Sequence, residues 1–373
     1  MAESTRLVDL VQEGIDAFLT EQAEHLAGIA ADLSPLADYA GGFLAGGKRF
    51  RALFCYWGWQ AAVGVPRGFD PLPDDQVHAG LPAIVQAAAA LELFHAAALV
   101  HDDIIDNSDT RRGSPATHRR FETLHSDQGW AGDGGRFGTS AALLLGDLLL
   151  GWSDEHFDRG GALLDDPKAA LAGRREFNRM RTEVTAGQYL DILEEHAWTT
   201  HPETQTLPRA HRVVVYKSAK YSIEAPLAIG ASLGGADESV VSALRDFGLP
   251  LGIAFQLRDD MLGVFGDPDK TGKPAGDDLR EGKRTVLIAL ARAGMPAHVR
   301  RLLDEMLGDP LLDDQQVEIL RTAITESGAV EQLEAIVARN VDAARTALRN
   351  APIGTTARHE LARLAQSVTV RTA

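Results

Sequence analysis

Long runs of alanine and leucine at helical spacing constrain the fold of this chain more than any other feature. Residues 81–106, "LPAIVQAAAALELFHAAALVHDDIID", place apolar side chains three and four positions apart, as do residues 138–157, 175–197 and 330–350. Alternating strand patterns are almost absent. Several of these helices are apolar around most of their circumference, which is typical of central members of a large bundle. We therefore predict an all-α fold, a large helical bundle.

Three segments rich in Gly, Pro and Asp are predicted to be loops, at residues 64–80, 125–138 and 266–284. The last, "GDPDKTGKPAGDDLREGKR", mixes acids with basic residues that include Lys270, Lys273, Lys283 and Arg284, and is predicted to be a charged loop. No long low-complexity linker divides the chain, and no internal repeat is evident. We therefore predict one domain over residues 1–373.

Charge and cysteine content narrow the classes of function. The net charge of −16, from 37 basic and 53 acidic residues, argues against a general nucleic-acid binder, because a phosphate backbone requires a basic footprint. A single cysteine, Cys55, excludes an intramolecular disulfide and fits a reducing cytosol. The N-terminal residues are predicted to form an amphipathic helix, and no stretch of about 18 to 20 uncharged apolar residues is present. We expect a cytoplasmic protein without a transmembrane segment.

The stretch "LVHDDIIDNSDTRRG", residues 99–113, concentrates acids on an otherwise apolar helix. Asp102 and Asp106 are one helical turn apart on the same face, with Asp103 beside them. Oxygen-only ligands of this kind suit Mg²⁺, which completes its shell with water and substrate phosphates. Arg111 and Arg112 could donate to phosphate oxygens. The alternative is a solvated helix end.

A second acidic cluster lies in "FQLRDDMLGVFGD", residues 255–267. Asp259 and Asp260 end an apolar helix just before the charged loop, and Gln256 shares a face with Asp260. Taken alone, this pattern also fits an ordinary helix-to-loop transition. Together with the first cluster, it predicts two acidic sites that face one cavity and hold several Mg²⁺ ions on one diphosphate.

Basic and amide side chains suggest further phosphate contacts, although each is weak by itself. In "GGKRFRA", residues 46–52, we expect Lys48 and Arg51 on a helix that Gly46 and Gly47 open, where the helix N-terminus favours an anion. Other candidates are Gln188 and Asp191 on one face, Lys217 and Lys220 in "YKSAKYS", and His95 two turns before Asp102.

Taken together, these motifs resemble the trans-prenyl diphosphate synthases of the polyprenyl synthetase family. The correspondence runs in the expected order from about residue 41 to 285, through "GGKRFR", "DDIID" with "RRG", "LLLGD", "GQYLD", "KSAKYS", "FQLRDD", "GDPDKTGK" and "EGKR". The resemblance implies an all-α homodimer of the isoprenoid synthase type, with a central cavity and with residues 286–373 as C-terminal helices. It also implies Mg²⁺-dependent head-to-tail condensation of isopentenyl diphosphate with an allylic diphosphate.

The resemblance assigns roles position by position. About three Mg²⁺ ions per active site would be held with substrate bound, by carboxylates on two sides of the allylic diphosphate. The metal ligands would be Asp102, Asp103, Asp106, Asp191, Asp259 and Asp260, with Gln256 beside them. The allylic substrate would be bound by Arg111, Gln188, Lys217, Lys273 and Lys283. Isopentenyl diphosphate would be bound by Lys48, Arg51, His95 and Arg112.

Two positions depart from the family pattern. Members often carry a third aspartate in the second motif, where this chain has Gly263, a change expected to loosen one metal position. The residue after Lys217 is commonly Thr and here is Ser218.

Product length should depend on residues that precede Asp102, because in this family the growing chain extends beside that helix. At a rise of about 1.5 Å per residue, Ala98 and Ala97 lie about 6 and 7.5 Å below Asp102, and Phe94 lies about 12 Å below it. The two alanines should pass a C15 tail, and Phe94 should block further growth. We predict geranylgeranyl diphosphate (C20). If Phe94 instead packs into the core, farnesyl diphosphate or a C25–C35 product is the alternative.

Three other classes compete with a synthase. A class I terpene cyclase shares the fold and one acidic motif, but "FQLRDD" and "GGKRFR" argue against it. A phosphohydrolase with a His-Asp pair would need further histidines that are not evident. A non-catalytic partner subunit would be expected to have lost the acidic motif that this chain keeps.

Overall fold

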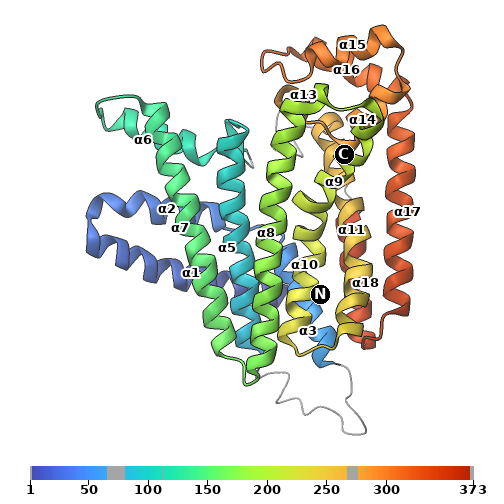
Figure 1. Cartoon of the computed structure of the whole chain (residues 1–373). Coiled ribbons are helices and arrows are strands. Elements are labelled where there is room, and N and C mark those ends of the chain that lie inside the picture. Colours follow the sequence, from blue (N-terminus) through green and yellow to red (C-terminus); the bar gives the residue numbers. More distant parts are fainter. Residues whose placement is uncertain (1, 65–79, 112, 267–275, 370–373) are drawn as a thin grey trace. The chain divides into compact units, whose positions relative to one another are not determined.

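The computed structural model describes residues 2–64, 80–111, 113–266 and 276–369, and these residues are predominantly helical (Figure 1). The one sheet among them is a short antiparallel ribbon of β1 (Thr110–Arg111) and β2 (Ser114–Pro115). The all-α prediction is confirmed. The chain forms two compact units, residues 1–174 with 229–236, and residues 175–228 with 237–373.

Unit 1 is built on α5 (Leu81–Ile105), which packs against α7 (Gly134–Ala162) and α3 (Phe50–Val63). Close approach of α7 to α5 requires a glycine, because a Cβ at Gly160 would meet the carbonyl oxygen of Ala83 at 2.9 Å. The Ser153 hydroxyl donates to the Ala90 carbonyl at 2.7 Å between the same two helices. The remaining helices of the unit are α1 (Ala2–Ile29), α2 (Ser34–Leu44) and α6 (Thr117–Asp127).

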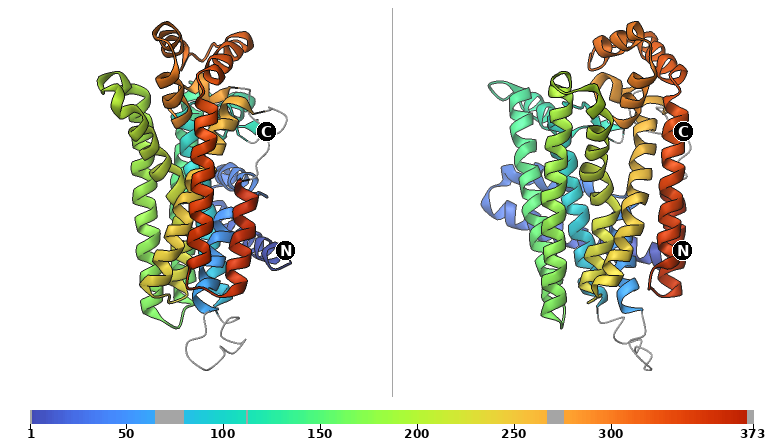
Figure 2. Two further views of the ribbon diagram at one scale, coloured as in Figure 1. Left: turned by 90° about the vertical axis from the view of Figure 1, so that its right-hand side faces the viewer. Right: turned by 45° about the vertical axis from the view of Figure 1, so that its right-hand side comes forward.

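Unit 2 is organised around α11 (Glu238–Phe265), which packs against α17 (Ala329–Asn350) and a π-helix, η4 (Val214–Glu224). Figure 2 shows α17 and α18 (Thr355–Thr369) as neighbouring C-terminal helices. The other helices are α9 (Thr206–Val213), α13 (Asp277–Glu281), α14 (Val286–Gly294), α15 (Ala297–Met306) and α16 (Asp314–Glu326). Helices α8 (Pro167–Ala197) and α10 (Ala225–Leu233) each run from one unit into the other.

Two helices, α5 and α11, are long and apolar enough to cross a membrane when only length and composition are considered. Their most apolar windows are 72% and 56% buried inside the protein, as expected for core helices of a bundle. Their hydrophobicity therefore has a structural explanation within the fold.

The predicted loops are shorter than expected where the structure describes them. Helix α6 continues to Asp127 and α7 begins at Gly134, because the Asp133 side chain caps α7 by accepting from the Arg136 amide at 3.2 Å. Residues 277–281 of the charged segment are helical, whereas 65–79 and 267–275 lie outside the described residues. The single-domain interpretation stays a prediction.

Candidate active site

The first aspartates lie at the C-terminal end of α5. The helix ends at Ile105, and the Asp106 amide donates to the Asp102 carbonyl at 2.8 Å, which keeps these two residues one turn apart. Asn107 then turns the chain with a positive φ of 51°. Asp103 is fully buried, at 0% exposure, while Asp102 and Asp106 are partly exposed. The accessible carboxylates are therefore the pair that the helical spacing placed on one face.

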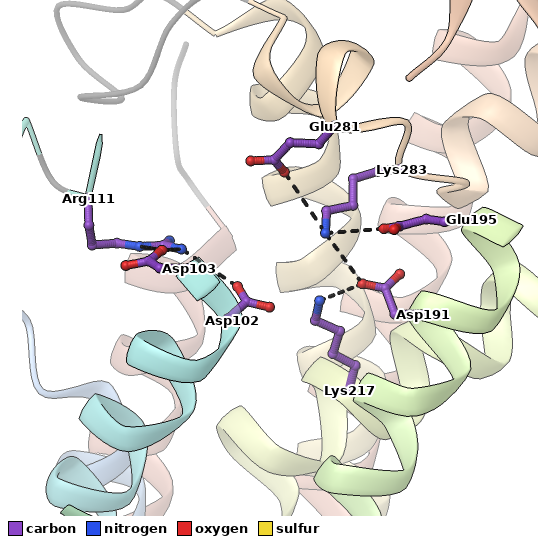
Figure 3. Close-up of polar contacts among 8 residues, drawn as sticks. All are labelled: Asp102, Asp103, Arg111, Asp191, Glu195, Lys217, Glu281 and Lys283. Carbon is purple, nitrogen blue, oxygen red and sulfur yellow. Dashed lines mark hydrogen bonds and ion pairs between the residues drawn. The ribbon is translucent and has the colours of Figure 1, made fainter. Parts of the chain in front are cut away.

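Arg111 reaches back to these aspartates from the β ribbon. The ribbon pairs Arg111 with Ser114, and the positive φ of Gly113, 75°, permits the tight connection. The Arg111 Nε donates to Asp103 Oδ1 at 2.8 Å, its Nη2 donates to the same oxygen, and Nη2 lies 3.6 Å from Asp102 Oδ2 (Figure 3). Arg111 thus holds a buried carboxylate as well as being a predicted phosphate ligand. Its neighbour Arg112 lies outside the described residues.

Asp109, the last acid of the opening cluster, has a different environment. Its carboxylate pairs with Arg119 of α6 at 2.8 Å, and Arg119 also donates to the Asn107 side chain at 3.3 Å. These contacts connect the turn after α5 to α6.

The expected helix through Lys48 and Arg51 is wrong at its beginning. Helix α3 begins at Phe50, so exposed Lys48 lies before the helix. The helix cannot begin earlier because Gly46, Gly47 and Arg49 have positive φ angles of 69°, 104° and 49°. Sequence reasoning missed the reason for this turn.

Arg49 is buried and serves as the anchor of that turn. Its guanidinium pairs with buried Glu92 of α5 at 3.2 Å, donates to Gln12 at 2.5 Å and donates to the Leu44 carbonyl. The sequence around Arg49 does not indicate that its acidic partner, Glu92, lies 43 positions further along the chain. The anchor fixes the backbone on which Lys48 and Arg51 lie.

Lys217 belongs to the π-helix η4. Two neighbouring helices each carry a glycine where they pack closely against η4. A Cβ at Gly187 of α8 would lie 2.3 Å from the Lys217 amide nitrogen, and one at Gly252 of α11 would lie 2.4 Å from the Ala219 carbonyl oxygen. One turn after Gly187, Asp191 accepts from Lys217 Nζ at 2.5 Å (Figure 3). The close backbone contact therefore brings together two predicted ligands.

Lys283 lies near the same aspartate. Its Nζ is 3.7 Å from Asp191 Oδ2, 3.4 Å from Glu195 Oε1 and 3.9 Å from Glu281 Oε2 (Figure 3). Glu195 and Glu281 were missed by sequence reasoning, although Glu195 follows Asp191 by one helical turn. Lys217 and Lys283 thus share Asp191 as an ion-pair partner.

The second aspartate pair lies near the C-terminal end of α11. The Gln256 amide donates to Asp260 Oδ1 at 2.7 Å, so these residues share a face as predicted. Asp259 is exposed and Asp260 is buried. Burial raises the pKa of Asp260 well above the ordinary value, the Gln256 hydrogen bond opposes this rise, and the negative charges of Asp278, Asp259 and Asp191 increase it.

The donor set suits a hard cation. Asp260 Oδ2 is buried and accepts no hydrogen bond from the part of the chain that the structure describes. Within that part, no three or more His, Cys, Asp or Glu side chains are grouped so that they could hold a metal ion by themselves. Mg²⁺ takes much of its shell from water and substrate phosphates, so carboxylates without nitrogen or sulfur donors fit it.

The residues predicted to set product length line one stretch of α5. Ala98 is partly exposed, as are His95 and Asp102 at helical spacing on the same stripe, whereas Ala97 and Phe94 are buried. Of the two alanines, Ala98 therefore lies on the face that also carries the aspartate.

The predicted site residues divide between the two units. Unit 1 holds Lys48, Arg51, Phe94, His95, Ala97, Ala98, Asp102, Asp103, Asp106 and Arg111, and unit 2 holds Gln188, Asp191, Lys217, Gln256, Asp259, Asp260 and Lys283. Lys273 lies outside the described residues.

Comparison with known proteins gives one consistent result. A family model described as polyprenyl synthetase matches residues 34–325. The short chain isoprenyl diphosphate synthase of Methanocaldococcus jannaschii is 32% identical over 245 residues, which cover 65% of this chain and 67% of that protein. The geranylfarnesyl diphosphate synthase of Aeropyrum pernix is 31% identical, with 73% of this chain and 79% of that protein covered.

Solved structures agree. The crystal structure of geranylgeranyl pyrophosphate synthase from Corynebacterium glutamicum, complexed with isoprenyl diphosphate and magnesium, matches with a TM-score of 0.88. The two chains are 36% identical, and the match covers 98% of this chain and 99% of that one.

Proposed function

The chain belongs to the polyprenyl synthetase family, and from this premise we propose that its product is geranylgeranyl diphosphate. It is a prenyltransferase that joins isopentenyl diphosphate head-to-tail to allylic diphosphates and makes an all-trans prenyl diphosphate. The C20 product is supported by the similarity to the corynebacterial geranylgeranyl pyrophosphate synthase and by the side chains along α5.

The reaction begins when the allylic C–O bond ionises to a diphosphate anion and a delocalised carbocation. We propose that Asp102, Asp103, Asp106, Asp191, Asp259 and Asp260 hold about three Mg²⁺ ions, consistent with the magnesium in the corynebacterial complex. Mg²⁺, when bound, supplies positive charge that stabilises the leaving diphosphate. Arg111, Lys217 and Lys283 add cationic donors to the same oxygens, together with Gln188 and Lys273.

The second substrate supplies the nucleophile, so no protein nucleophile is required. We propose that Lys48, Arg51, His95 and Arg112 bind the diphosphate of isopentenyl diphosphate, whose alkene attacks the carbocation. The new carbocation then loses a proton to the departing diphosphate, which gives the lengthened allylic diphosphate. The Arg49–Glu92 pair supports this proposal because it fixes the backbone turn between Lys48 and Arg51. Apolar side chains must exclude water, which would otherwise capture the carbocation.

Product length is the part of the proposal that rests on single side chains. Ala98 shares the accessible stripe of α5 with Asp102, and Phe94 lies one further turn along the helix. Phe94 is buried, which also meets the condition for the farnesyl or C25–C35 alternative, so the product length of the wild type decides between them. We expect Phe94 to close the path for the chain.

The deciding experiment incubates purified protein with Mg²⁺, labelled isopentenyl diphosphate and, separately, dimethylallyl, geranyl and farnesyl diphosphates. The chain length of the dephosphorylated products is then measured. A dominant C20 alcohol is expected, and Phe94→Ala should shift products to C25 or longer. A different length from the wild type would keep the reaction and reject Phe94 as the floor. No incorporation from any starter would reject the synthase assignment.

We also propose a cytoplasmic homodimer. Leu143 and Leu144 of α7 are large apolar side chains with exposures of 48% and 59%, and such a patch commonly marks a protein interface. Sedimentation analysis of the wild type and of Leu144→Glu tests the assembly. A wild-type protein that sediments as a monomer would contradict it.

A further inference from the structure

Trp198 is the aromatic centre of a cluster that contains two arginines. The residue begins the 3₁₀ helix η2 (Trp198–Thr200), which directly follows α8. The guanidinium carbon of Arg284 lies 3.8 Å from the centre of its ring, and that of Arg292 lies 4.9 Å from the same centre. A guanidinium at such a distance over an indole is attracted by the negative face of the ring. One tryptophan therefore holds two cations.

The carboxylate of Asp304, on α15, binds the same two arginines. Arg292 donates to both of its oxygens, at 2.7 and 2.9 Å, and Arg284 donates to Oδ1 at 3.2 Å. Their side chains are only 10% and 8% exposed. Burial lowers the pKa of Arg284, the charge of Asp304 and its hydrogen bond oppose this shift, and the charge of Arg292 adds to it. A single carboxylate thus faces two buried cations, and the ring of Trp198 supplies further compensation.

Arg284 directly follows Lys283 in the short connection between α13 and α14. Residues 283–285 have no regular secondary structure. The Thr285 hydroxyl caps α14 at one end of this connection, and Gly282, with φ of 80°, turns the chain at the other end. Because no helix or strand fixes the backbone between these two points, the direction of the Lys283 side chain depends on the contacts that hold its neighbours.

One face of α8 and of its extension into η2 binds both residues. Asp191, Glu195 and Trp198 follow one another at intervals of four and three residues, which is the spacing of one helical face. Lys283 Nζ lies 3.7 Å from Asp191 Oδ2 and 3.4 Å from Glu195 Oε1 (Figure 3). Arg284 lies over Trp198, the next position along that face. The two carboxylates and the ring therefore hold consecutive residues of the connection.

We propose that Trp198 is a positioning residue for Lys283, which it aligns through Arg284. This inference rests on the proposed function, in which Lys283 binds the allylic diphosphate. With Arg284 stacked on the ring, the Lys283 side chain starts from a fixed backbone and places its ammonium group beside Asp191. Without the ring, the connection has more conformational freedom, which is lost again when the allylic substrate binds and therefore weakens binding.

The test compares the KM for farnesyl diphosphate with the KM for isopentenyl diphosphate in purified full-length variants. Trp198→Leu keeps an apolar side chain but removes the ring, so the KM for farnesyl diphosphate should rise about tenfold, as expected when a desolvated cation–π contact is lost. Trp198→Phe keeps a ring under Arg284 and should raise this KM less than about threefold. The KM for isopentenyl diphosphate should stay within about twofold of wild type in both variants.

Phe18→Leu is the matched control for loss of a ring that faces an arginine. Phe18 is buried in α1 with the guanidinium carbon of Arg159 at 5.1 Å from its centre, and neither residue is a predicted ligand. This variant should lower the melting temperature, because a core side chain becomes smaller, and should leave both KM values within about twofold of wild type.

Arg284→Gln tests the same link from the other side. It leaves Trp198 in place, and Asp304 keeps its two hydrogen bonds from Arg292. The KM for farnesyl diphosphate should rise as it does in Trp198→Leu, so the inference can be tested even if one of the two variants fails to fold.

A double variant separates positioning from a merely structural role. If Trp198 acts through Lys283, Trp198→Leu should add little to the KM for farnesyl diphosphate once Lys283→Ala is present, because the two changes remove one effect. The inference is overturned if the Trp198→Leu and Arg284→Gln variants that fold keep the wild-type KM, if both KM values rise equally, or if the effects of Trp198→Leu and Lys283→Ala add in full. Failure of the proposed function would appear instead as wild-type protein that incorporates no isopentenyl diphosphate.

Discussion

The two aspartate motifs use the same side chain at the end of an apolar helix, but their electrostatic environments are opposite. In the first motif, Arg111 donates two hydrogen bonds to buried Asp103 and approaches Asp102. In the second, buried Asp260 receives a hydrogen bond from the neutral amide of Gln256, and Asp278 adds negative charge beside it. The first motif therefore carries its own counter-charge, whereas the second gathers like charges.

This difference separates folding from ligand binding. When a buried carboxylate faces a guanidinium, loss of either partner is destabilising, because the other charge stays buried without compensation. A buried carboxylate among other acids lowers stability until a cation binds. We therefore expect substitutions in the two motifs to have similar effects on activity and opposite effects on the free energy of unfolding.

The largest effect is expected for an accessible aspartate of the first motif. Asp102→Asn should lower kcat for isopentenyl diphosphate incorporation about 10³-fold, because a lost electrostatic contact to the leaving group raises the barrier by several kcal/mol. Asp109→Asn is the control, since Asp109 pairs with Arg119 at an exposed position and should change kcat less than about twofold. If both variants lost kcat equally, Asp102 would owe its effect only to its place in the acidic cluster, and not to the helical face that it shares with Asp106.

The arginine of the first motif should matter for stability. Arg111→Gln removes the cation that faces Asp103 and should lower the free energy of unfolding by about 3 kcal/mol at neutral pH. Adding Asp103→Asn to this variant should restore part of the stability and none of the activity. Urea denaturation measures the free energy of unfolding of both variants. If Arg111→Gln were as stable as wild type, the expected difference between the two motifs would be contradicted.

The second motif should respond with the opposite sign. Asp260→Asn is expected to raise the free energy of unfolding by about 1 kcal/mol without Mg²⁺ at neutral pH, while it removes activity. The folded protein raises the pKa of Asp260, so the native state binds this proton more tightly than the unfolded chain does. Its contribution to stability is therefore present below the unfolded pKa and lost as pH rises through the folded value.

Denaturation at several pH values, with EDTA present, follows this loss. The gap between Asp260→Asn and wild type should widen toward neutral pH and close again when Mg²⁺ and diphosphate are added. A variant less stable than wild type at neutral pH would show that Asp260 is already compensated within the fold.

Local sequence patterns predicted the parts of this molecule that depend on neighbours along the chain. Helical periodicity located α5 and α11, and the spacing of four residues placed Asp102 with Asp106 and Gln256 with Asp260. The family motifs then supplied the reaction.

Contacts between distant positions could not be predicted in the same way. Nothing near Arg49 indicates Glu92 as its partner, and the left-handed turn that this pair stabilises made the predicted helix through Lys48 wrong. The sequence also does not show that the Asp278 carboxyl group lies where a Cβ at Gly263 would be, with its Oδ2 at 2.0 Å from that position. Both cases require knowledge of packing.

The π-helix around Lys217 has a consequence for how the chain can change. A π-helix has the hydrogen-bond pattern expected when one extra residue is inserted into an α-helix. Deleting one residue from Val214–Glu224 would relax this segment to an ordinary helix and turn everything after the deletion by about 100°. Lys217 would survive such a deletion, yet the backbones that now touch Gly187 and Gly252 would face other directions. The number of residues in this π-helix therefore matters to the site as much as the presence of Lys217 does.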